Sequence, residues 1–419
     1  MNEAIVMSPT PSDEDLDDSV PFRMNNRQSG ALIASTIIGV GVLTLPRSTA
    51  SYAAQNGWIS ALIGSVFAML LLSLISTLVR RHPGMSMVGF TRQLLTPGRH
   101  KRIGLLLALP FLLSYALYWT SGTALVARIF GEVVTTTVLK RTPLEVIIGT
   151  MLITAFILVM HDIEVLVRVN EVLLPLIVIP LAIIGLSSLQ SAQLVNLLPM
   201  FQVNWWGFLK GTALSTTSYL GFEMLMIFGA IGEQSGKPLR YHLLGVAVPG
   251  LVYSLIVFSG IAVFGVDELE LLAWPTLELV KTTEVPGLIL ERLESAFLAV
   301  WVAAVFTTLG NLYYGTCTML KEIMGLKHHR WIALALLPLF YWTSLQAPNV
   351  QVLFELMSRW DLFGLFNASV IPLFLLILSF MRRHGKETPH PENEANEDRA
   401  ATAAAAALSD PPEMPMQKE

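Results

Sequence analysis

The chain has 419 residues, of which 53% are hydrophobic and 14% are charged, and its mean hydropathy is +0.59. A water-soluble protein of this length exposes far more charge, so the apolar excess indicates a chain embedded in lipid. The formal net charge of −4 comes from the two ends, because residues 1–22 hold six acids without Lys or Arg and residues 385–419 hold eight acids against three bases. Between these ends, 24 Lys and Arg outnumber 17 acids.

The two ends read as tails rather than as folded parts. They are polar and acidic, and the second contains an alanine run at residues 400–407 without large apolar residues. Neither tail can bury enough apolar area to offset the entropy lost on ordering. The predicted organisation is therefore a disordered acidic tail (1–22), one transmembrane domain (23–384) and a disordered polar, alanine-rich tail (385–419).

The middle of the chain is divided into long apolar stretches. A helix needs about 20 mainly apolar residues to cross a bilayer, and lipid demands that every backbone group be satisfied within the protein. We therefore predict an all-α polytopic membrane protein with about ten transmembrane helices. The predicted spans are 28–50, 57–79, 103–128, 144–161, 165–187, 207–231, 241–265, 291–318, 331–346 and 352–381. The connections 80–102 and 266–290 are long enough to hold short helices lying on the membrane faces.

The distribution of basic residues predicts the orientation. With ten spans and a cytoplasmic N-terminus, 17 Lys and Arg fall on the inner side and 8 on the outer side or its flanks. Cytoplasmic segments carry the excess of Lys and Arg in membrane proteins. Both termini are therefore predicted to be cytoplasmic.

Two spans contain glycine where a continuous helix would disfavour it. The first span reads Ile38-Gly39-Val40-Gly41 and the sixth contains Gly221 just before an acid. Unwound backbone survives inside a membrane only where protein or a polar cavity satisfies it. Breaks in spans one and six, five spans apart, predict a 5+5 inverted repeat, with the N-terminal ends of the outer half-helices facing a central site. The alternative is that these glycines only permit close helix packing.

Glu223 is the most informative charge, because it lies inside the sixth span. A charged group at such depth is costly and indicates function. It could pair with a substrate amine, carry a proton or act as a gate. The alternative is a structural hydrogen bond to the broken backbone of a neighbouring helix. Tyr115 and Tyr118 on span three and Thr307, Thr308 and Asn311 on span eight are further polar candidates for a pocket.

The sequence contains no recognisable catalytic arrangement. The eight histidines lie in connections, span ends or tails, and no phosphate-binding loop or Ser/His/Asp set is present. We predict no enzyme activity, no cofactor, no metal site and no nucleic-acid partner.

Several segments together resemble the spore germination permease family. They are IGVGVLTLPR (38–47), EVLLPLIVIP (171–180), NLLPMF (196–201), LGFE (220–223) and WPTLELVKTTEVPG (274–287). The resemblance covers roughly residues 23–384. It implies membership of the amino acid–polyamine–organocation (APC) superfamily and its LeuT-like 5+5 inverted repeat with helices 1 and 6 broken. The long acidic and alanine-rich tails depart from many relatives.

The resemblance also implies a function. Members of the family are B subunits of nutrient germinant receptors, which sense an amino acid or sugar in the inner spore membrane beside A-type and C-type subunits. The positions that match the superfamily's ligand region are Gly39, Gly41, Gly221, Phe222 and Glu223. A receptor subunit that binds a small nutrient, an amino acid by preference, is the first hypothesis. A proton-coupled amino-acid or polyamine transporter is the second.

Overall fold

The computed structural model describes residues 22–96, 101–199, 202, 204–233, 236–282 and 293–382. Both predicted tails, apart from Phe22 at the edge of the first, lie outside these residues. The described part is helical, with one isolated backbone bridge between Met24 and Gly232 and no strand. The longer helices are α1 (Asn26–Ile37), α2 (Gly41–Ala53), α3 (Gly57–Arg80), α4 (Met87–Leu95), α5 (Lys101–Thr137), α6 (Leu144–Met160), α7 (Ile163–Ser188), α8 (Trp205–Thr217), α10 (Pro238–Leu271), α11 (Pro275–Lys281), α12 (Leu293–Met324), α13 (Arg330–Ser344) and α14 (Val350–Met381). The short pieces are η2 (Ala54–Asn56), η3 (Leu189–Ser191), η4 (Leu194–Leu197), η5 (Phe222–Met224), α9 (Leu225–Phe228) and η6 (Gly229–Ile231).

Each predicted span corresponds to one of these helices or to a broken pair of them. Six helical segments of the described residues are long and apolar enough to cross a membrane, and the pair Trp205–Thr217 and Phe222–Ile231, bent by 44°, would be a seventh. The remaining predicted spans are shorter than that criterion or are interrupted, so the count of ten stays a prediction. The expected short helices in the long connections are present as α4 and α11.

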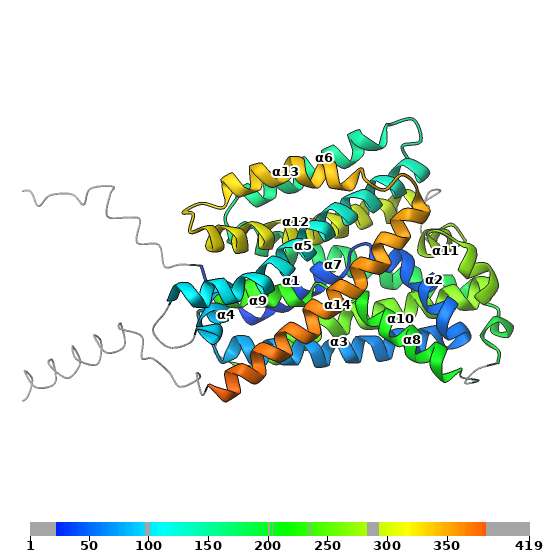
Figure 1. Ribbon diagram of the computed structural model, residues 1–419. Helices are drawn as coiled ribbons and strands as arrows, with labels where there is room; N and C mark the ends of the chain where they lie inside the picture. Colours follow the sequence, from blue (N-terminus) through cyan, green and yellow to red (C-terminus); the bar gives the residue numbers. More distant parts are fainter. Residues whose placement is uncertain are drawn as a thin grey trace, which may run out of the picture.

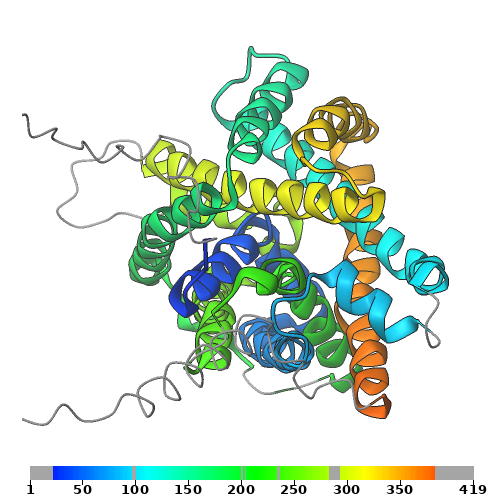
Figure 2. The ribbon, with the colours of Figure 1, turned by 90° about the vertical axis from the view of Figure 1, so that its left-hand side faces the viewer.

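The helices form an elongated bundle around the broken spans (Figure 1). α1 packs against α7, α10 and α12, while α2 and α3 pack against α8 and α10. Viewed from the end, α1 and α9 lie near the middle and α6 and α13 lie at the periphery (Figure 2). The centre of the bundle is therefore built from the segments whose helices are interrupted.

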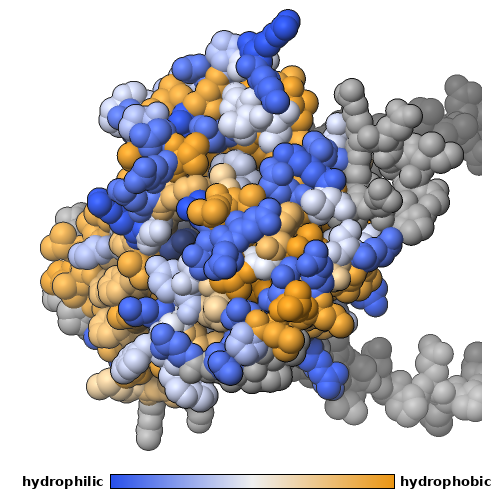
Figure 3. Space-filling model, turned by 90° about the vertical axis from the view of Figure 1, so that its right-hand side faces the viewer, coloured by the Kyte–Doolittle hydropathy of each residue, from blue (hydrophilic) through white to orange (hydrophobic). Residues whose placement is uncertain are grey.

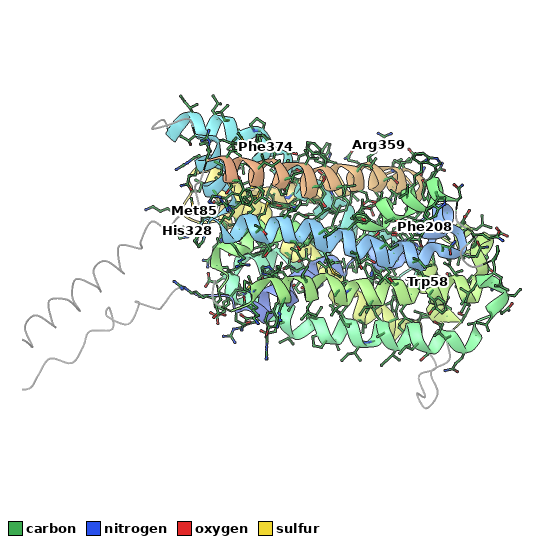
Figure 4. All side chains as sticks on the ribbon, turned by 90° about the horizontal axis from the view of Figure 1, so that it is seen from below. Trp58, Met85, Phe208, His328, Arg359 and Phe374 are labelled. Atoms are coloured by element: carbon green, nitrogen blue, oxygen red, sulfur yellow. The ribbon has the colours of Figure 1, made fainter. Side chains whose placement is uncertain are left out.

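The ends of the bundle agree with an even number of crossings. The described chain starts and finishes at the same end, which also carries α4, while α11 lies at the opposite end (Figure 1). Met85 and His328, predicted to lie on the inner side, are together at one end, and Phe208 and Arg359 are at the other (Figure 4). The end that carries α11 is a mixture of hydrophilic and hydrophobic side chains around a central recess (Figure 3). Which end faces the cytoplasm stays a prediction.

Candidate functional site

The first span is broken where its glycines predicted a break. α1 ends at Ile37, α2 begins at Gly41, and Ile38 has a non-helical ψ of 85°. Gly39 lies so close to α12 that a Cβ there would stand 2.6 Å from the Thr308 hydroxyl oxygen. Close approach to a neighbouring helix is one of the physical uses of glycine. The packing explanation and the break explanation are therefore both correct at this position.

Side chains from other helices satisfy the backbone carbonyls that this break releases. The Thr308 hydroxyl donates to the carbonyls of Ser35 and Thr36 at 3.1 Å each. The Tyr253 hydroxyl donates to the Ile37 carbonyl at 3.0 Å, and Trp301 Nε1 donates to the Gly39 carbonyl at 3.2 Å. Buried carbonyls without partners would be costly, so these donors make the break a stable feature of the fold.

The sixth span is broken in the same region of the bundle. α8 ends at Thr217, a turn follows, and Gly221 adopts a φ of 122° before η5 begins. L-residues with side chains rarely adopt such a φ, so glycine is required here. A Cβ on Gly221 would lie 2.9 Å from Thr36 Cγ2, and one on Gly41 would lie 3.2 Å from the Ser218 carbonyl oxygen. The two breaks therefore touch, as the inverted-repeat prediction required.

The directions of the half-helices correct one detail of that prediction. α2 packs beside α8, whereas α1 packs beside η5 and α9, so the two broken spans run antiparallel. The chain enters the first break at the end of α1 and the second at the end of α8. The prediction placed the N-terminal ends of both half-helices on the α2–α8 side at the central site. Only α2 has its N-terminus at a break, because α8 meets the other break with its C-terminus. The second N-terminus belongs to η5 on the other side.

Glu223 lies immediately after the second break and is fully buried, with 0% of its surface exposed. Its Oε2 accepts a 2.7 Å hydrogen bond from the Gly221 backbone N–H. Its Oε1 has no partner at hydrogen-bonding geometry, and the same is true of the nearby indole Nε1 of Trp119. One oxygen therefore holds the broken backbone of its own span. The other makes no hydrogen bond of good geometry, although the side chains of Tyr118 and Trp119 lie close to the carboxyl group.

A cavity lies between the two breaks. Five of the predicted site residues line it, namely Gly39, Gly41, Tyr118, Gly221 and Glu223. Thr308, whose hydroxyl satisfies carbonyls of α1, also lines the cavity. The sequence thus placed glycines, an aromatic residue and an acid in the same site.

Three predicted site residues do not line this cavity. The Tyr115 hydroxyl donates to the backbone carbonyl of Asn367 on α14. Phe222 is buried in the hydrophobic core. The Thr307 hydroxyl donates within its own helix to the Ala304 carbonyl at 2.9 Å. Their geometry gives them packing and helix-tethering contacts around the site.

Three lining residues from α14 were missed by the sequence analysis, namely Met357, Trp360 and Asp361. Trp360 Nε1 donates to the Tyr118 carbonyl at 2.9 Å, and the two rings stack with centroids 5.0 Å apart. Asp361 lines the cavity beside Thr217. The signal for Asp361 was available, because it is an acid inside the predicted tenth span and the argument used for Glu223 applies to it equally.

A buried pair of amides supports the last turn of α1 from behind. Asn170 on α7 and Asn311 on α12 exchange side-chain hydrogen bonds of 2.8 Å in both directions. Asn311 Nδ2 also lies 2.8 Å from the Thr36 hydroxyl oxygen. Asn311 was a predicted pocket candidate, and its position is instead that of a support for the residues that line the pocket.

Comparison with known proteins supports this assignment of the fold and adds the family. A family model described as "Spore germination protein" matches residues 23–351. The chain belongs to this family. Spore germination protein YndE of Bacillus subtilis (strain 168) is 26% identical over 366 residues, covering 87% of this chain and 98% of the relative. Spore germination protein B2 of the same organism is 26% identical over 358 residues, covering 85% of this chain and 95% of the relative.

Several solved structures share this fold. MhsT in complex with L-phenylalanine superimposes with a TM-score of 0.61 at 12% identity, covering 84% of this chain and 88% of MhsT. The Eremococcus coleocola manganese transporter superimposes with a TM-score of 0.58 at 15% identity, covering 83% and 78% of the two chains. At these identities the likeness shows the fold. This member of the spore germination family is thus a non-enzymatic, multi-pass membrane protein with a LeuT-type transporter fold.

Proposed function

We propose that this chain is the integral-membrane B subunit of a spore nutrient germinant receptor and that an amino acid binds in the cavity between the two breaks. The observation that carries the proposal is the fully buried carboxyl group of Glu223 in that cavity, whose Oε1 makes no hydrogen bond of good geometry. Burying a carboxylate oxygen without a hydrogen-bond partner destabilises the protein, and a ligand ammonium group is a partner of the right charge. Family membership supplies the biological setting.

The rest of an amino acid also finds complementary chemistry in this cavity. α2 points its N-terminus at the break, and Gly41 at its start lines the cavity. The first amides of a helix lack intrahelical acceptors and favour negative charge, so they suit the ligand carboxylate. The cavity therefore offers an anion-binding end at α2 and a cation-binding end at Glu223.

The proposed assembly follows from the family. The protein would lie in the inner spore membrane with both termini on the spore-core side, beside A-type and C-type receptor subunits and the lipid bilayer. Ligand binding would then be passed to these partners. The described part of the chain starts and finishes at the same end of the bundle (Figure 1), which supports placing both termini on one side of the membrane.

A proton-coupled amino-acid or polyamine transporter is the second candidate, and a second hollow favours it. This hollow lies at the opposite end of α1 and is lined by Ser29, Leu225, Gly229 and His242 among others. α1 and the segment after the sixth-span break line both hollows. These two segments would form the barrier that a transporter must open.

The test of the proposed site compares Glu223→Gln with Glu223→Ala. Gln keeps an acceptor for the Gly221 N–H but removes the charge, so ligand response per unit of membrane-inserted protein should fall about tenfold to a hundredfold, equivalent to about 1–3 kcal/mol. Ala removes the acceptor too, so it should also lower the amount of protein in the membrane. Glu145→Gln, at an exposed position at the start of α6, is the control.

The ligand for this comparison is found by exposing spores that lack the gene to a panel of amino acids and sugars. A germinant that fails on the mutant spores is then tested for binding and for uptake into proteoliposomes. Binding without uptake supports the receptor, and uptake driven by a proton gradient supports the transporter. Wild-type ligand response in Glu223→Gln would refute the assigned role of this residue.

A further inference from the structure

The cavity between the breaks has a second carboxylate, which the proposed function does not use. Asp361 comes from α14 and Glu223 from the sixth span, and both line the same cavity. Tyr118 lies within electrostatic range of both carboxylates. Among the described residues that line the cavity there is no Lys, Arg or His. The cavity is therefore acidic on two sides.

Neither carboxylate is neutralised by a basic side chain of the described chain. The ion pairs there are Arg128–Glu132, Arg168–Glu164 and Lys281–Glu278, and none includes a cavity acid. The arginine closest to Asp361 in sequence is Arg359, which is exposed and lies at the edge of the bundle (Figure 4). Arg47 on α2 instead stacks over the Phe354 ring, 4.9 Å from its centroid.

Two carboxylates that line one cavity repel each other, and burial costs each of them hydration energy. One ligand ammonium group at Glu223 would offset only one of them. A second positive group would offset the cost of burying the other carboxylate and would replace the repulsion between the two carboxylates by attraction to the ligand. A metal ion is a poorer match, since the described residues contain no cluster of three or more His, Cys, Asp or Glu side chains able to hold one.

We propose that the ligand is an α-amino acid with a positively charged side chain, whose α-ammonium group meets Glu223 and whose side-chain cation meets Asp361. This inference rests on the proposed amino-acid site and narrows it to one substrate class. In this arrangement the ligand carboxylate faces the N-terminus of α2, and Thr217 and Tyr118 flank the side chain. Glu223 determines that an amine binds, and Asp361 determines which amino acids are preferred.

The test measures binding to the full-length protein in lipid nanodiscs by calorimetry. L-Lysine is compared with L-norleucine, which has the same six-carbon chain with a hydrogen in place of the ε-ammonium group, and with cadaverine, which lacks the carboxylate. L-Lysine should bind at least about tenfold more tightly than either, because truncating one partner of a buried charge pair typically costs that much or more. This ratio is measured on the unmodified protein and does not depend on any variant folding.

The variant Asp361→Asn should then weaken L-lysine binding by about tenfold or more while leaving L-norleucine unchanged or slightly tighter. Glu355→Gln, which removes a charge from an exposed position on the same helix, is the matched control and should change neither. An unchanged lysine affinity in Asp361→Asn, or an equal loss in Glu355→Gln, would overturn the assignment of Asp361.

The remaining outcomes separate this inference from the function on which it rests. Tight binding of L-norleucine with weak binding of L-lysine would overturn the basic-ligand proposal and leave the amino-acid site in place. Cadaverine binding as tightly as L-lysine would overturn the carboxylate contact and make the occupant a diamine. If no amino acid in a full panel binds, both the inference and the proposed function fail.

Discussion

Gly221 is the position where a single methyl group should do the most damage. Its φ of 122° lies in a region that L side chains rarely adopt, and a Cβ there would stand 2.9 Å from Thr36 Cγ2 and 3.2 Å from the Thr36 carbonyl carbon and oxygen. The side chain of Thr36 cannot absorb the whole contact, because part of it is with backbone. Gly221→Ala must therefore move either the first break or the second.

The expected cost has two parts. A residue with a side chain held at such a φ costs about 1–3 kcal/mol. Forcing a methyl group into closely packed atoms costs about 1–3 kcal/mol more. The free energy of unfolding should thus fall by about 2–6 kcal/mol, and the ligand response should fall as well, since the Gly221 N–H positions the Glu223 carboxylate.

Thermal unfolding of the purified protein in detergent measures this effect, with expression yield as a second readout. Gly149→Ala is the control, because Gly149 lies inside the helix α6 and a Cβ there would meet only Tyr341 Cε2, at an ordinary 3.7 Å. Alanine is favoured over glycine in a helix by about 1 kcal/mol, so the control should be neutral or slightly stabilising. A Gly221→Ala protein as stable as the Gly149→Ala protein would refute the strained-break reasoning.

Two further predictions concern the support of the first break and the orientation. Thr308→Val keeps the shape but removes the donor to the carbonyls of Ser35 and Thr36, so it should lower stability by about 1–3 kcal/mol in the same unfolding assay, whereas Thr308→Ser should be close to wild type. Equal stability of the Val and Ser variants would show that the hydroxyl is dispensable. Reporter fusions near residues 90 and 325 should score as cytoplasmic and a fusion near 275 as external. The reason is the excess of Lys and Arg in the connections that contain residues 90 and 325. A cytoplasmic score at 275 would overturn the predicted orientation.

Polar side chains in the centre of this bundle hydrogen-bond to the interrupted backbone. Thr308, Tyr253 and Trp301 each donate to a carbonyl at the end of α1 or in the break, and Glu223 accepts from the backbone of the other break. Inside a membrane, the backbone groups at these breaks have no water to hydrogen-bond with. Each of these side chains therefore stabilises backbone that would otherwise form a continuous helix.

The sequence by itself determined the helical spans and their interruptions. Long apolar stretches can only be helices in lipid, so hydropathy was enough to locate the long apolar helices. Gly39, Gly41 and Gly221 were enough to locate both breaks, because the pattern of small residues recurs five spans apart. The depth of Glu223 within its span marked it as a candidate without any structure, since an acid in lipid must have a reason.

Only the tertiary structure decided which side chains meet at those breaks. Successive residues of a helix point about 100° apart, and the sequence analysis predicted Thr307 as the site residue, whereas the rotation of α12 places Thr308 at the cavity. The same rotation of α5 chose Tyr118 over Tyr115 for the cavity. A span that is apolar on both its lipid face and its protein face has no hydrophobic periodicity that would show which side faces the protein. Packing against neighbouring helices therefore sets the rotation of the span about its axis. That packing also brought Asp361, nearly 140 residues along the chain, into the cavity of Glu223.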